Sequence, residues 1–161
     1  MVIPPDIFPL LPKDTAYVAN TVFGKRPVYL TIGDQLPDLL AKIDLAPLGF
    51  ENASTWTLVF CALVTVLQFV ENLPDCRVAV ASRTRIDWKY ALRLPIAYPG
   101  FDPQLLHEFR LHLKRHPAAQ LAFQQLLDQL ADIGLFDHVA RHHIETTELL
   151  AAVCAVNDQV L

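Results

Sequence analysis

The sequence predicts an all-α protein, a compact bundle of about six or seven helices that contains a helix-turn-helix-like unit. Hydrophobic residues make up 53% of its 161 residues and charged residues 19%, a balance typical of a folded domain. Apolar residues recur at spacings of three and four along most of the chain, the period of a helix. Strand-like alternation never lasts long enough to build a sheet.

The first part of the chain divides into an arm and a helix. Residues 1–28 are rich in proline and lack a clear period, so we expect an extended N-terminal arm. Over residues 33–43 the leucines follow helical spacing, with Asp34 as the cap. Pro37 is tolerable there only near the first turn.

The most apolar segment predicts a buried core helix. Ser54 is a suitable cap, and the pattern runs to about Asn72. Polar residues form one narrow stripe, and nearly every other position is large and apolar. The longest apolar run, Trp56 to Val70, is interrupted by Thr57, Thr65 and Gln68 and falls short of the roughly 20 residues that span a bilayer, so we expect no membrane partner.

Three shorter helices are expected next, over residues 75–84, 86–94 and 102–115. Pro74 and Asp75 are typical of a first turn, and Asp102 caps the third of these helices. In that third helix the side chains of His107, Arg110 and Lys114 share one edge about 60° wide. Short helices joined by tight turns, with a cationic edge on the last, are the arrangement that a helix-turn-helix module needs.

Charge is strongly segregated along the sequence. The chain has a net charge of -4, yet residues 76–115 hold eight cations against three acids. Arginine and lysine neutralise phosphates, and arginine also binds guanine edges. A solvated cationic face is the alternative that charge alone favours. If the segment binds DNA, the predicted binding residues are Arg77, Arg83, Arg85, Lys89, Arg93, His107, Arg110, Lys114 and Arg115.

Two roles are distinguished within this set. We expect Arg83, Arg85, Lys89 and Arg93 to contact the DNA backbone, and His107, Arg110, Lys114 and Arg115 to form the groove-facing edge. Trp88 and Tyr90 lie two residues apart and do not share a helix face. Tyr90 is the better core candidate. Trp88 either packs under Arg85 or Lys89, which is the more common arrangement, or stacks on a group outside the protein.

The rest of the chain predicts two more helices and no metal site. One helix ends at Gly134, and another begins at Thr146 or Thr147. Between them His138 and His142 stand four apart with Glu145 nearby, but an isolated HxxxH pattern is frequent by chance. The cysteines Cys61, Cys76 and Cys154 form no CxxC pair, and a reducing cytoplasm fits them best.

Several stretches resemble a known family. "VTVLQFVENLPD", "RIDWKYALRL" and "PGFDPQLLHEFRLHL", with "LLDQLADIGL" and "TTELLAAVCAVN" after them, are similar to the N-terminal helical domain of bacterial insertion-sequence DDE transposases of the InsH N-terminal type. The resemblance covers roughly residues 30–157. It implies a helical DNA-binding domain over residues 29–136 that recognises transposon ends, and a remnant of the start of the catalytic domain over residues 137–161.

The resemblance also bears on catalysis. The family uses three acids and a divalent metal such as Mg²⁺ in its catalytic domain, because carboxylates hold metal ions against the reacting oxygens. Glu145 stands where the family has its first aspartate, and the resemblance implies that the other two acids would lie beyond Leu161. We therefore expect a catalytically incomplete protein without a cofactor of its own, associated with the bacterial nucleoid.

Two functions follow as hypotheses. The first is a DNA-binding module whose partner is double-stranded DNA. The second is a regulatory fragment that self-associates or pairs with a full-length transposase, through an apolar face formed by Leu149, Leu150, Val153 and Val156.

Overall fold

The structure, a computed structural model, describes residues 9–49, 53–138 and 143–159. Within these residues the fold is all-helical, as predicted, with eight α-helices instead of six or seven. They are α1 (Lys13–Val22), α2 (Val28–Ala41), α3 (Thr55–Glu71), α4 (Asp75–Thr84), α5 (Ile86–Ala91), α6 (Gln104–Arg115), α7 (Pro117–Asp132) and α8 (Thr146–Asp158), with a short 3-10 helix, η2 (Ala46–Leu48), between α2 and α3.

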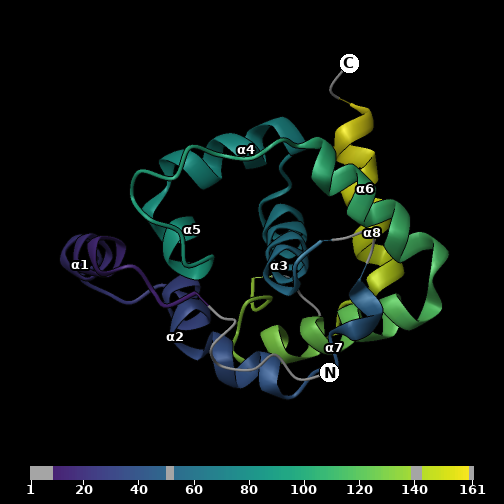
Figure 1. Cartoon of the computed structure of the whole chain (residues 1–161), viewed down its shortest axis with the longest axis horizontal. Helices are drawn as coiled ribbons and strands as arrows, with labels where there is room; N and C mark the ends of the chain where they lie inside the picture. Colours follow the sequence, from purple (N-terminus) through teal and green to yellow (C-terminus); the bar gives the residue numbers. More distant parts are fainter. Residues whose placement is uncertain (1–8, 50–52, 139–142, 160–161) are drawn as a thin grey trace.

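Helix α3 is the centre of the bundle. Figure 1 shows it nearly end-on, with the other helices arranged around it. Ser54 caps it by accepting a 3.1 Å hydrogen bond from the Thr57 amide, and it ends at Asn72 in the left-handed conformation, φ 57°. Every residue from 58 to 68 is buried. The predicted core helix and both its limits are confirmed.

The N-terminal arm is the first correction. Residues 13–22 are helical, so the expectation of an extended arm over 1–28 is wrong for this part, and residues 1–8 lie outside the described chain. The Thr15 hydroxyl of α1 donates to the Leu94 carbonyl at 2.6 Å, and Ala19 packs with Leu30 and Tyr90. Tertiary packing of this kind stabilises a ten-residue helix that has no side-chain cap.

Helix α2 carries a proline in its interior. It begins at Val28, so Pro37 lies well beyond the first turn, contrary to the sequence expectation. Proline lacks the amide that would bond the carbonyl four residues earlier. That carbonyl belongs to Gly33, and the Arg93 guanidinium donates to it through Nη2 at 3.0 Å. A side chain from beyond α5 thus replaces the missing helical hydrogen bond.

Helix α8 belongs to the same core as the rest of the chain. Ile144, Leu149, Leu150 and Val153 are buried in one cluster with residues of α3, α6 and α7. Within the described residues, α8 thus shares one core with helices of the expected domain over residues 29–136. The apolar face assigned to a partner protein is also largely covered, because these side chains pack against their own domain.

In the described part of the chain, no single helix is long and apolar enough to cross a membrane. Helices α3 and α4 reach that length and composition only when they are taken together, and the pair is bent by 105°.

Candidate nucleic-acid interface

Arg110 lies inside the protein, paired with Asp75. Its Nη1 donates to Asp75 Oδ1 and its Nη2 to Asp75 Oδ2, both at 2.8 Å, and its side chain is only 5% exposed. The expectation that Arg110 lies on an exposed groove-facing edge is wrong. The position of Arg110 on the helical wheel is as predicted, but its guanidinium is bonded to an acid 35 residues earlier in the sequence.

Asp75 joins four helices at this point. The Gln68 amide of α3 donates to its carboxylate at 2.7 Å, and its own backbone amide donates to Asn157 Oδ1 of α8 at 2.9 Å. Burial raises the pKa of the Asp75 carboxyl, but the hydrogen bonds from Arg110 and Gln68 outweigh burial, and the net pKa lies below its usual value. The first residue of α4 is therefore fixed as an ionised, fully bonded group.

The remaining edge of α6 borders a cleft. His107, Arg110 and Lys114 line one side of it, and Cys154, Asn157 and Asp158 of α8 line the other. Lys114 Nζ donates to Cys154 Sγ at 3.0 Å. His107 and Lys114 are exposed, but they line the same cleft as residues of α8. The predicted edge thus faces α8, a helix that the sequence interpretation assigned to another domain.

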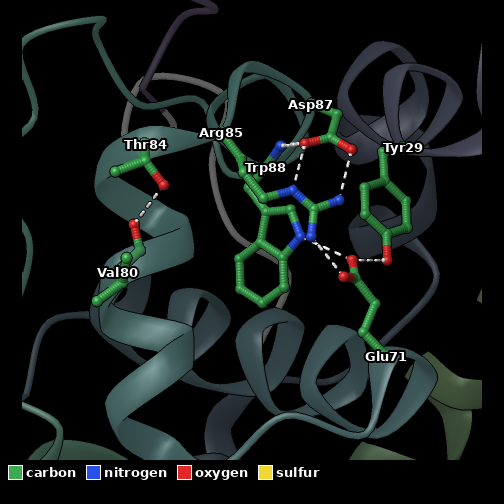
Figure 2. A network of polar contacts seen from close by, with 7 residues as sticks. All are labelled: Tyr29, Glu71, Val80, Thr84, Arg85, Asp87 and Trp88. Atoms are coloured by element: carbon green, nitrogen blue, oxygen red, sulfur yellow. Dashed lines mark hydrogen bonds and ion pairs between the residues drawn. The ribbon is translucent and has the colours of Figure 1, made fainter.

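Arg85 and Trp88 belong to a network around Glu71, which Figure 2 shows. The Glu71 carboxylate accepts hydrogen bonds from Tyr29 Oη at 2.6 Å, from Trp88 Nε1 at 2.9 Å and from Arg85. Arg85 also pairs with Asp87 at 2.8 Å, and its guanidinium lies 5.6 Å from the centre of the Trp88 ring. The predicted packing of Trp88 under Arg85 is confirmed, and Trp88 is fully buried.

This network keeps Glu71 charged. Burial raises the pKa of Glu71, but the hydrogen bonds from Arg85, Tyr29 and Trp88 together hold that pKa below its usual value. The pKa of Tyr29 is raised, first by burial and then by its bond to Glu71. Arg85 is consequently half-buried between two acids, which argues against the predicted contact with a DNA backbone.

Lys89 is buried and Arg93 is half-buried. Lys89 is 4% exposed and its ammonium donates to the Ile96 carbonyl. Arg93 has a left-handed backbone, φ 55°, and bonds the carbonyls of Pro9 and Gly33 at 3.0 Å each. Backbone carbonyls thus bind the charged groups of both residues, which argues against the predicted contacts with DNA. Tyr90 is buried, as predicted.

Five members of the predicted set are exposed. They are Arg77 and Arg83 of α4, and His107, Lys114 and Arg115 of α6.

The two exposed arginines of α4 belong to a face that the sequence interpretation missed. Cys76, Arg77, Val80, Arg83 and Thr84 are all exposed, and we call them the α4 outer face. At 3.6 residues per turn they share an arc of about 120°. Their spacing of three and four was the signal available in the sequence. The one acid within α4, Asp75, is bonded to Arg110.

A short connection with a sharp change of direction joins α3 to α4. Three residues, Asn72, Leu73 and Pro74, separate the two helices, which are bent by 105°; helix-turn-helix motifs have angles of about 90–120°. The Leu73 amide donates to the Gln68 carbonyl at 3.0 Å and closes the turn. Helix α4 lies at the edge of the bundle (Figure 1).

The acidic position implied by the resemblance lies elsewhere. Glu145 is exposed and precedes the first residue of α8. His138 is exposed, whereas His142 lies outside the described residues. Within residues 9–49, 53–138 and 143–159, no group of three His, Cys, Asp or Glu side chains could hold a metal ion.

Comparisons of the chain with protein-family models, with curated proteins and with solved structures found no match. The resemblance to a transposase domain therefore stays a prediction from the sequence motifs.

Proposed function

We propose that this protein binds double-stranded DNA, with α3 and α4 as a helix-turn-helix and α4 as the helix presented to the major groove. The observation that carries the proposal is the α4 outer face. It holds Arg77 and Arg83 and no acid, on the second helix of a pair bent by 105°. In motifs of this kind the second helix enters the groove and the first braces it.

The interior contacts support this role for α4. Asp75 is held by Gln68, Arg110 and Asn157, so the start of α4 is attached to three other helices. A recognition helix needs such fixing, because side chains that read bases must keep their register against the duplex. Arg110 also neutralises the Asp75 carboxylate, so the start of α4 carries no unpaired negative charge that would repel phosphates.

Helix α6 supplies further cations for the same partner. Lys114 and Arg115 are exposed at its C-terminal end, and His107 is exposed two turns earlier. We assign these side chains to the phosphate backbone. Contacts to phosphates position a protein on DNA without reading its sequence.

We further propose that the module is related to insertion-sequence transposases and recognises transposon-end DNA without catalysing strand transfer by itself. The motifs "RIDWKYAL" and "PGFD", followed by "EFR", support the relationship. The glutamate Glu145, at the position where the family has its first aspartate, supports the lack of catalysis.

Fluorescence anisotropy with a labelled mixed-sequence duplex tests the proposal. Binding should be detectable at low salt and should weaken steeply as salt rises, because counterions are released from each neutralised phosphate. The same strand without its complement is the control and should bind more weakly. An absence of duplex binding at low salt, with transposon-end repeats included among the probes, contradicts the proposal.

A further inference from the structure

Val80 is an apolar side chain at the centre of a cationic face. It is 42% exposed, one of few large hydrophobic side chains at the surface of the described chain. On a helix of 3.6 residues per turn it lies midway across the α4 outer face, with Arg77 near one border of the arc and Arg83 near the other. Figure 2 shows it one turn from Thr84, on the side of α4 away from Trp88.

Val80 is the apolar side chain at the centre of the α4 outer face, and polar side chains surround it. The Thr84 hydroxyl donates back to the Val80 carbonyl at 2.9 Å, so its hydrogen bond is made within α4. The two arginines lie six residues apart, which is about 9 Å along the helix axis. That length matches roughly two to three base pairs of duplex.

A single exposed valine needs no ligand of its own. Val80 together with Arg77 and Arg83, however, matches chemical groups that the major groove presents. The major groove offers one apolar feature, the C5-methyl group of thymine, and it offers guanine O6 and N7 to arginine. An acidic protein surface would match the arginines but leaves the valine without a defined counterpart.

We infer that Val80 reads a thymine methyl group in the major groove, between base or phosphate contacts made by Arg77 and Arg83. This inference rests on the proposed DNA-binding function and names the base that the α4 outer face selects. The structure thus assigns the specificity-determining position to α4 and not to the edge of α6.

Selection from a random duplex library tests the inference. The duplex that binds best is made again with uracil in place of each thymine in turn, which removes the methyl group and keeps both hydrogen-bonding edges. At one position the wild-type protein should bind the uracil duplex about three- to fourfold more weakly, the value of one buried methyl group. The Val80→Ala variant should bind both duplexes about equally.

The outcomes separate the inference from the function beneath it. Equal binding of thymine and uracil duplexes by the wild-type protein overturns the role of Val80 and leaves DNA binding intact. A uracil effect that persists in Val80→Ala also overturns it, because another residue then reads the methyl group. No binding of any duplex, together with capture of an acidic protein, overturns both proposals. Circular dichroism of Val80→Ala checks that the variant is folded.

Discussion

Arg110 and Asp75 form a two-pointed ion pair that ties the middle of α6 to the first residue of α4. The sequence suggested that Arg110 binds DNA. In the structure Arg110 instead fixes α4, the helix that we propose binds DNA. The two partners of the ion pair lie 35 residues apart, and both are largely buried.

Loss of this pair should destabilise the fold. In Arg110→Ala the Asp75 carboxylate stays buried without its partner, and we expect the free energy of unfolding to fall by about 3–5 kcal/mol. Urea denaturation measures this change. Arg115→Ala, which removes an exposed cation from the same helix, should stay within about 0.5 kcal/mol of the wild type. An Arg110→Ala protein as stable as Arg115→Ala contradicts the structural role.

The replacement of a helical hydrogen bond by Arg93 predicts coupling with Pro37. Arg93→Met leaves the Gly33 carbonyl without a donor and should cost about 1–3 kcal/mol of stability. In a Pro37→Ala background the restored amide of residue 37 bonds that carbonyl, so the same substitution should cost less, with a coupling energy of about 0.5–3 kcal/mol. A double-mutant cycle in urea measures the difference. The same cost in both backgrounds shows that Arg93 does not substitute for the missing amide.

Close packing of α2 on α5 predicts that Gly33 tolerates no side chain. A Cβ at this position would lie 2.5 Å from Tyr90 Cδ1 and 2.6 Å from the Tyr90 carbonyl oxygen. We expect Gly33→Ala to lower the melting temperature, with an overpacking cost of about 1–3 kcal/mol. Gly24→Ala is the matched control, because a Cβ there meets nothing within 4 Å. A stabilised Gly33→Ala, as helix propensity alone predicts, argues against this contact.

The lowered pKa values of Glu71 and Asp75 predict acid sensitivity. Their ordinary values are 4.5 and 3.8, and both are lower in the folded protein. Near these values the unfolded chain binds more protons than the folded one. The stabilisation is therefore complete above about pH 5 and is lost as pH falls through the lowered pKa values. Urea midpoints measured from pH 7 to pH 3 should fall in acid, and Glu71→Gln should show a shallower fall. An equal fall in both proteins excludes Glu71 as a contributor.

Local patterns predicted much of the fold. The predicted features include the all-helical class, the core helix with Ser54 and Asn72 at its ends, and the packing of Trp88 under Arg85, which all depend on spacing and capping within short segments. Helix α1 was missed because it follows a proline-rich stretch and has no side-chain cap, and packing on α5 stabilises it. Helix α8 was assigned to another domain because sequence motifs do not reveal which core an apolar face joins.

The candidate site was harder to predict because charge along a sequence does not show which charges pair. Glu71 and Asp75 precede the basic segment of residues 76–115, yet they form ion pairs with Arg85 and Arg110. Backbone carbonyls take up Lys89 and Arg93. Arg77 and Arg83, which share the segment, stay exposed on the α4 outer face.

The charge-matched comparison of two double variants tests the central claim most directly. Arg77→Ala with Arg83→Ala removes the arginines of the α4 outer face, whereas Lys13→Ala with Lys25→Ala removes two exposed lysines near α1 with the same change in net charge. Duplex affinity is measured by anisotropy at one fixed salt concentration. We predict a loss of at least about tenfold for the arginine pair, from contacts of about 1–3 kcal/mol each, and little change for the lysine pair. Equal affinities for the two double variants would contradict α4 as the DNA-binding helix.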